Sequence, residues 1–177
     1  SPMANNASPP PNGDNVDAKL KIYFLPNLFT AGNLFCGFVA LTKIVEADLS
    51  TGEFLEIKLA LGFILLACIF DLFDGRVARM GGIESPFGRE FDSLADLVSF
   101  GVAPALLLYQ WQLSELKGLG WTVTMAFAVC CALRLARFNT KLDNTDLPAW
   151  TSRFFVGVPA PAGAGLALIP VMATFEL

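Results

Sequence analysis

The sequence predicts an all-α protein, a polytopic membrane helix bundle with at least five transmembrane helices. The 177 residues are 54% hydrophobic and only 16% charged, whereas a soluble domain carries about 25% charged residues. The apolar residues also come in long blocks, each of the length that crosses a bilayer. Together these two observations favour the membrane class over a single soluble domain of the same length.

The chain begins with a polar segment that we expect to be disordered. Residues 1–18 are rich in Pro, Asn and Ser, and Ser1 to Met3 look like the remnant of an expression tag. The first apolar block has neither a basic leader nor a small-residue cleavage site, so no cleavable signal peptide is predicted. Residues 19–25 mix Lys with Leu, Ile, Tyr and Phe, which is typical of a short stretch at the membrane interface.

Five blocks then have the length and apolarity of membrane helices. They span residues 26–45, 57–79, 91–111, 120–138 and 154–175, and the connections between them are short and polar. Neither an internal repeat nor a second domain is recognisable, so residues 19–177 are expected to form one transmembrane domain. Because the fifth block reaches the last residues, we expect this chain to be truncated at its C-terminus and the intact protein to have six helices or more.

Basic residues gather on one side of the predicted bundle. If the helices alternate in direction, nine of the twelve Lys and Arg residues fall on the side of the N-terminus, and the other side receives three Lys among five acidic residues. The nine are Lys19, Lys21, Arg76, Arg79, Arg89, Arg134, Arg137, Lys141 and Arg153. By the positive-inside rule, the N-terminus and the connection after the second helix are cytoplasmic.

Composition also narrows the chemistry. The chain has no His, which excludes His-based general-base catalysis and His metal sites. There is no basic stripe of the kind that binds nucleic acid. The four cysteines lie in apolar blocks without a CxxC pair, and we interpret them as small buried hydrophobic residues: Cys36, Cys68, Cys130 and Cys131. Carboxylates remain as the available hard metal ligands.

Four aspartates stand out within this apolar chain, in two groups with helical spacing. They are Asp71, Asp74, Asp92 and Asp96. The first two share a helix face with Gly75 and Ala78, and the last two share a face with Gly88. The four carboxylates should therefore converge where the second helix ends and the third begins. The small residues on the same faces would let a bulky ligand approach the backbone.

Such crowding of like charges requires compensation. Each ionisable group within a span costs on the order of 3 kcal/mol, and one or two hard divalent cations, with two expected, would offset the repulsion. An all-oxygen site suits Mg²⁺ or Mn²⁺. One alternative is a solvated, charged connection between two helices without a ligand. Another is the permeation site of a divalent-cation transporter, although such a site is expected near the membrane midplane between repeats.

The run from residue 71 to residue 96 resembles the signature of the CDP-alcohol phosphotransferase family, D-x2-D-G-x2-A-R-x8-G-x3-D-x3-D, with every fixed position occupied. The resemblance implies a membrane enzyme that transfers a group from a CDP-activated substrate to an alcohol and releases CMP. It also implies that the four aspartates bind the metals, that Asp92 and Asp96 are catalytic, and that Asp96 serves as general base. Gly75, Ala78, Arg79 and Gly88 would line the CDP site.

Five segments, four of them outside the run from residue 71 to residue 96, resemble one group of enzymes within this family. Residues 25–30, 33–37, 91–104, 132–139 and 155–159 are similar to the membrane-embedded phosphatidylserine synthases of bacteria. The resemblance therefore implies CDP-diacylglycerol and L-serine as substrates, phosphatidylserine and CMP as products, a homodimer, and a site on the cytoplasmic face of the bacterial inner membrane. Glycerol 3-phosphate and an inositol phosphate are the alternative acceptors.

Further polar residues have two interpretations each. Asn27 and Thr30 share a face in the first helix, where they either contact the cytidine or cap a helix that begins after Pro26. Arg134 and Arg137 share a face in the fourth helix, with Asn139 just beyond. In one interpretation, this second group binds the serine carboxylate or a lipid phosphate. In the other, its arginines only extend to the membrane interface.

Overall fold

The computed structural model describes residues 13–51, 54–81, 85–143 and 158–175. Over these ranges the chain is helical and contains no β-strand, so the all-α prediction is confirmed. The helices are α1 (Gly13–Glu46), α2 (Leu55–Gly81), α3 (Pro86–Asp96), α4 (Ala103–Trp111), α5 (Gly118–Asp143) and α6 (Ala160–Thr174).

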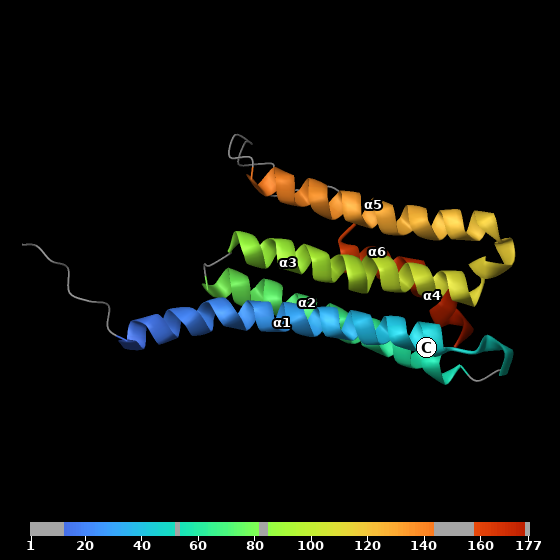
Figure 1. The fold of residues 1–177 in the computed structure, drawn as a ribbon, viewed down its shortest axis with the longest axis horizontal. Helices are drawn as coiled ribbons and strands as arrows, with labels where there is room; N and C mark the ends of the chain where they lie inside the picture. Colours follow the sequence, from blue (N-terminus) through green and yellow to red (C-terminus); the bar gives the residue numbers. More distant parts are fainter. Residues whose placement is uncertain (1–12, 52–53, 82–84, 144–157, 176–177) are drawn as a thin grey trace, which may run out of the picture.

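The helices form a bundle of five roughly parallel rods, because α3 and α4 are joined end to end (Figure 1). The α1 and α2 helices form the most extensive pair, and α1 also packs against α3 and α4. The α5 helix lies on the other side of the α3–α4 rod from α1 in Figure 1, whereas α6 contacts α4 and the segment before it. The five rods correspond to the five apolar blocks of the sequence.

Within the described part of the chain, three segments are long and apolar enough to cross a membrane. They are Phe24–Glu46, Pro86–Trp111 and Gly118–Thr140, of 23, 26 and 23 residues. The α2 helix is longer, at 27 residues, but charged residues interrupt its apolar run, and α6 is an apolar helix of only 15 residues. The protein is therefore an integral membrane helix bundle, and the crossing of the bilayer by α2 and α6 remains a prediction.

The α1 and α3 helices begin five or more residues earlier than the sequence predicts. The α1 helix begins at Gly13 and continues through Pro26, so the prediction of disorder is wrong for residues 13–18, and residues 1–12 lie outside the described part. Membrane helices tolerate an internal Pro because neighbouring groups satisfy the freed carbonyl. The α3 helix begins at Pro86 instead of residue 91, because Ser85 caps it and its Oγ accepts a 2.9 Å hydrogen bond from the Gly88 amide.

The fifth predicted helix is shorter in the structure than in the prediction. The α6 helix begins at Ala160, directly after Pro159, and ends at Thr174. Residues 154–157 of the predicted block lie outside the described part of the chain. The α5 helix, by contrast, extends the predicted block at both ends.

The α3–α4 rod contains a π-helical turn, Leu97–Val102, directly after Asp96. Ser99 and Phe100 are fully buried within this turn. Gly37 of α1 faces Ser99 so closely that a Cβ at Gly37 would collide with Ser99 Oγ and lie 3.0 Å from Ser99 Cα. Small residues at such crossings let two membrane helices approach backbone to backbone. The backbones of α1 and the rod therefore approach each other closely at the π-turn.

The apolar core runs from this crossing toward the end of the bundle that is remote from the aspartates. Its buried residues include Ala40, Ile44, Ile57, Ile64, Phe100, Leu107, Leu168 and Val171. Cys36 belongs to this core, as predicted, but Cys130 is exposed. The reason is that much of α5 faces outward without a neighbouring helix among the described residues, so the prediction of burial is wrong for Cys130.

Candidate active site

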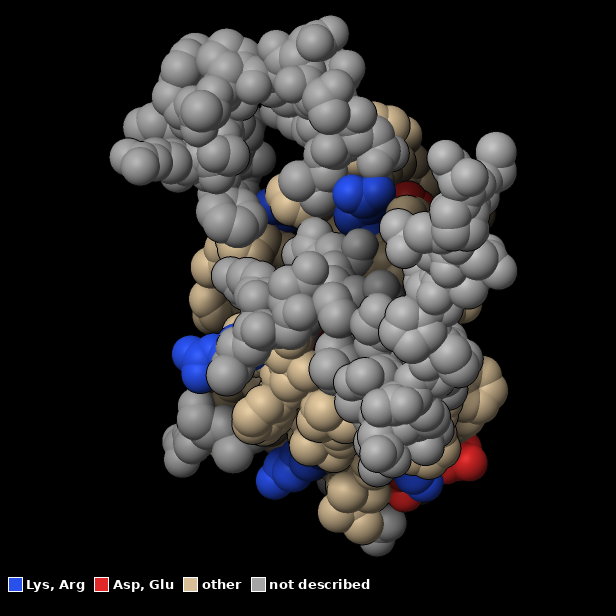
Figure 2. Space-filling view, turned by 90° about the vertical axis from the view of Figure 1, so that its left-hand side faces the viewer, with Lys and Arg blue, Asp and Glu red and all other residues tan. Residues whose placement is uncertain are grey.

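The aspartates lie near one end of the bundle, on two helices that run in opposite directions. Asp71 and Asp74 lie in the second half of α2, and Asp92 and Asp96 lie in α3, after the connection between the two helices. The C-terminal part of α5 reaches the same end (Figure 1). Figure 2 looks onto this end and shows Lys and Arg side chains at several places around it. The predicted meeting of the two helix ends is therefore present in the structure.

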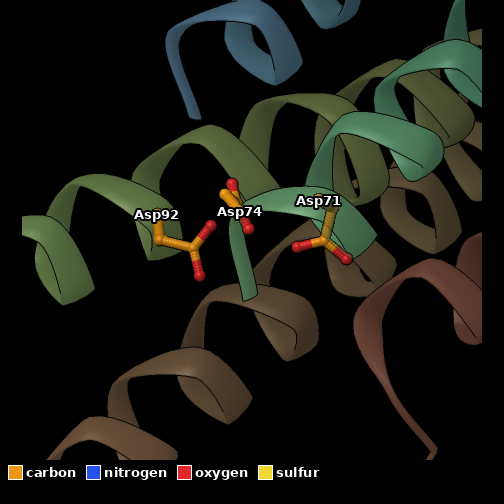
Figure 3. Close-up of side chains that lie close together, drawn as sticks. All are labelled: Asp71, Asp74 and Asp92. Atoms are coloured by element: carbon orange, nitrogen blue, oxygen red, sulfur yellow. The ribbon is translucent and has the colours of Figure 1, made fainter. Parts of the chain in front are cut away.

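Three carboxylates form a close cluster. One oxygen each of Asp71, Asp74 and Asp92 lies within 4.8 Å of the others, and Asp74 lies between the other two in the view of Figure 3. Asp92 Oδ1 is buried and has no hydrogen-bond partner among the described residues. Three oxygen donors with an unsatisfied buried atom fit a hard cation such as Mg²⁺ or Mn²⁺. The residues present are thus suited to the predicted metal.

Asp96 occupies a different position from the other three. It is only 7% exposed and stands next to Asp71, whose carboxyl group it faces. Its Oδ1 accepts a 3.0 Å hydrogen bond from Nδ2 of Asn33, a fully buried residue of α1. Sequence reasoning missed Asn33 as a site residue. The signal that could have found it is a polar amide three residues after Thr30 on an otherwise apolar helix.

Thr30 contacts the cluster directly. Its Oγ1 lies 3.0 Å from Oδ2 of Asp74 and 3.1 Å from the carbonyl oxygen of Pro26, and the side chain is buried. The interpretation of Thr30 and Asn27 as caps of a helix beginning after Pro26 is wrong, because α1 is already helical there. The hydroxyl of Thr30 is instead directed at a carboxylate of the site.

The other residues predicted to bind CDP lie close to the cluster. A Cβ at Gly88 would lie 3.2 Å from Oδ1 of Asn27, so the beginning of α3 and this part of α1 are adjacent. Gly75 follows Asp74 in α2. Ala78 and Arg79 also belong to α2, but their side chains lie outside the described part of the structure.

The residues predicted to bind the acceptor lie on α5 and are not equivalent. Asn139 is buried, and its Nδ2 donates to Oε2 of Glu90 at 3.2 Å and lies 3.0 Å from Oγ of Ser93, which also lies 3.3 Å from Asn139 Oδ1. These contacts join α5 to α3. Arg134 is half-buried and Arg137 is exposed on the same helix. Asn139 is therefore engaged in helix packing, whereas the two arginines make no such interhelical bond among the described residues.

The chain matches a known protein family and is similar in sequence to several curated proteins. The model of the CDP-alcohol phosphatidyltransferase family matches residues 23–176. A CDP-diacylglycerol–serine O-phosphatidyltransferase of Mycobacterium leprae is 44% identical over 145 residues, which are 82% of this chain and 45% of the relative. Proteins of the same name from Helicobacter pylori J99 and Bacillus subtilis are 38% and 35% identical, over 85% and 86% of this chain and 58% and 77% of the relatives. The chain thus spans about half the length of the mycobacterial and Helicobacter relatives.

Proposed function

Because this chain belongs to the CDP-alcohol phosphatidyltransferase family, we propose that it transfers a phosphatidyl group from CDP-diacylglycerol to the hydroxyl of L-serine, giving phosphatidylserine and CMP. The observation that carries the proposal is the convergence of Asp71, Asp74 and Asp92 oxygens within 4.8 Å at one end of the bundle. The names of the relatives support CDP-diacylglycerol as donor and serine as acceptor.

The metal site of this proposal consists of Asp71, Asp74, Asp92 and Asp96, holding Mg²⁺ or Mn²⁺, with two ions as the expected number. When bound, the cations would neutralise the diphosphate and the charge that develops on the departing CMP. The cluster of three has the tight spacing that cation binding needs. Asp96, which lies next to Asp71 and is held by Asn33, would complete the set from the deeper side.

The serine hydroxyl oxygen attacks the β-phosphorus of the donor in this reaction, forming a new P–O bond, and the bond from phosphorus to the CMP oxygen breaks. The hydroxyl proton passes to a carboxylate, for which we assign Asp96, with Asp92 one turn away on the same helix. Since Asp is a weak base, with a reference pKa of about 3.9, the position of the two substrates must contribute much of the rate enhancement.

The nucleotide would lie along the small residues of α2 and α3. We assign it to Gly75, Ala78, Arg79 and Gly88, with Asn27 and Thr30 of α1 alongside. The proximity of Asn27 and Gly88 supports a shared surface between α1 and α3. Glycine and alanine at these places leave the backbone open to a phosphate or a sugar.

Arg134 and Arg137 are the residues of α5 that we propose for binding the serine carboxylate or the lipid phosphate, since a guanidinium group binds both with two parallel hydrogen bonds. Asn139 was predicted with them, but its bonds to Glu90 and Ser93 favour a role in packing. We further propose a cytoplasmic site in the bacterial inner membrane, from the distribution of basic residues, and a homodimer, from the family resemblance.

The test uses the full chain in lipid nanodiscs with CDP-diacylglycerol, Mg²⁺ and one alcohol at a time, and measures CMP release. We expect release with L-serine that EDTA abolishes and that Asp92→Asn lowers by at least about 100-fold. The matched control is Glu115→Gln, which neutralises an exposed acid outside the site. Release with glycerol 3-phosphate or an inositol phosphate but not with serine would reject the serine assignment. Metal flux into liposomes without CMP release would favour a transporter.

A further inference from the structure

The α1 helix contributes two hydrogen-bond donors to the site, on one face and one turn apart. Thr30 Oγ1 lies 3.0 Å from Oδ2 of Asp74, and Asn33 Nδ2 lies 3.0 Å from Oδ1 of Asp96. The two acceptors are on different helices, α2 and α3. Thr30 and Asn33 are 3% and 0% exposed. The α1 helix therefore contacts both helices that carry the aspartates, and it does so from the interior of the bundle. Over its described residues, it contributes no carboxylate of its own to the site.

Each contact engages one oxygen of a carboxylate and leaves the other. Asp74 Oδ2 and Asp96 Oδ1 accept these two bonds, so the second oxygen of each carboxylate, Asp74 Oδ1 or Asp96 Oδ2, is not the acceptor of these bonds. In metal sites, partners of this kind fix the orientation of the ligands, and their loss typically costs about 10- to 100-fold in affinity. Thr30 and Asn33 of α1 have the geometry of such partners, because each donates a hydrogen bond to a predicted metal ligand.

The hydroxyl of Thr30 has a choice of acceptors, because its one proton also lies within reach of the Pro26 carbonyl at 3.1 Å. A carboxylate is the stronger acceptor, since hydrogen bonds to ionised groups are roughly twice as strong as neutral ones. Thr42 of the same helix shows the ordinary alternative: its Oγ1 donates to the Val39 carbonyl at 2.7 Å, and it makes no hydrogen bond to an aspartate of the site. Thr42 is thus a matched control for Thr30.

The backbone of Asn33 is itself fixed by a hydrogen bond from another segment. Ser99 of the π-helical turn donates a 3.1 Å hydrogen bond from Oγ to the backbone carbonyl of Asn33, and both residues are fully buried. Gly37, one turn further along α1, permits this close approach. The backbone that carries the Asn33 amide is therefore fixed against the rod that carries Asp96.

We propose that Thr30 and Asn33 are positioning residues of the metal site, which hold Asp74 and Asp96 so that one oxygen of each faces the cations. This role rests on the proposed function only through the metal ligands and requires neither serine nor CDP-diacylglycerol. It also gives Thr30 a role other than contact with cytidine.

The experiment measures Mn²⁺ binding by electron paramagnetic resonance on the full chain in nanodiscs without substrates. The free-ion signal gives the affinity, and the spectrum of bound Mn²⁺ reports the symmetry of its ligands. We expect Thr30→Val, which removes the hydroxyl at nearly constant shape, to weaken binding roughly tenfold and to change the bound spectrum. Thr30→Ser should restore both, and Thr42→Val should leave both unchanged.

Asn33→Leu should weaken binding independently of Thr30→Val. Because the two residues hold different acids on different helices, their effects on the free energy of Mn²⁺ binding should add in the double variant. Wild-type Mn²⁺ affinity and bound spectrum in Thr30→Val would overturn the proposal, even if CMP release were lost. Loss of Mn²⁺ binding in both Thr30→Val and Thr30→Ser would also overturn it, since the side-chain hydroxyl would then not be the deciding group. CMP release with L-serine by the wild type tests the proposed function separately.

Discussion

Gly37 of α1 and Ser99 of the π-helical turn are in backbone contact, with the Cβ position of residue 37 only 3.0 Å from Ser99 Cα. This crossing lies one turn from the hydrogen bond between Asn33 and Asp96. The spacing of the helices at the site is thus set by the absence of a side chain at position 37.

Gly37→Ala should therefore destabilise the protein. Alanine normally gains about 1 kcal/mol over glycine inside a helix, but here the added methyl group would push α1 from the rod, at a cost of roughly 1–3 kcal/mol. Gly62→Ala in α2 is the matched control, because a Cβ there meets nothing within 4 Å. Thermal unfolding in detergent measures both variants. Equal melting temperatures for Gly37→Ala and Gly62→Ala would contradict the close crossing.

Asp92→Asn should change stability in opposite directions with and without metal. In EDTA, the substitution removes one of several crowded negative charges, and we expect a gain of roughly 1–3 kcal/mol in the free energy of unfolding. In saturating Mg²⁺, the wild type gains the free energy of binding, and the variant gains less. The measurement is the melting temperature in each condition, with Glu115→Gln as control. A variant less stable than wild type in EDTA would show that Asp92 makes a favourable contact there.

Ser85→Ala should weaken the beginning of α3. The lost bond from the Gly88 amide to Ser85 Oγ normally contributes about 1 kcal/mol at a helix N-cap. Ser85→Asp should retain most of the stability, since Asp caps equally well. Ser114→Ala changes an exposed serine that caps no helix and serves as control. If chemical unfolding shows Ser85→Asp to be as unstable as Ser85→Ala, the cap does not stabilise α3.

Asn139→Ala should loosen α5 from α3. Removing a buried amide that bonds to Ser93 and Glu90 should cost roughly 1–3 kcal/mol. Ser93→Ala should cost less, and the double variant should cost less than the sum, because the two side chains share a bond. Unfolding of all three variants measures the coupling. A raised KM for serine with unchanged stability would instead support the acceptor-binding role predicted from the sequence.

The helix faces that carry the aspartates could be predicted, because the aspartates of each pair are close together in the sequence. Asp71 with Asp74, and Asp92 with Asp96, project from one side of any regular helix, whatever surrounds it. The contact of Asn33 with Asp96 joins residues 63 positions apart, and no local pattern encodes that packing. The separation of Asp96 from the cluster of three depends on the same packing.

The predicted and observed starts of α1 and α3 differ for local reasons, and the two reasons are not the same. Pro26 is typical of a first helical position, but α1 passes through it, so of the two interpretations of Asn27 and Thr30 the one as helix caps is wrong. Ser85 followed by Pro86 is the ordinary signal of a helix start and could have placed the beginning of α3 correctly. No comparable local signal in the sequence marks the π-turn Leu97–Val102.

The π-helical turn Leu97–Val102 divides the rod into two angular phases. A π-turn holds more residues than an α-turn, so everything from Ala103 onward is rotated relative to Asp92 and Asp96. Deleting one residue between 97 and 102 would restore a uniform α-helix and swing one half of the rod by about 100° relative to the other. Either the acids or the core residues Ala103 and Leu107 would then face outward. In this rod, the length of the chain between site and core is as constrained as the identity of its residues.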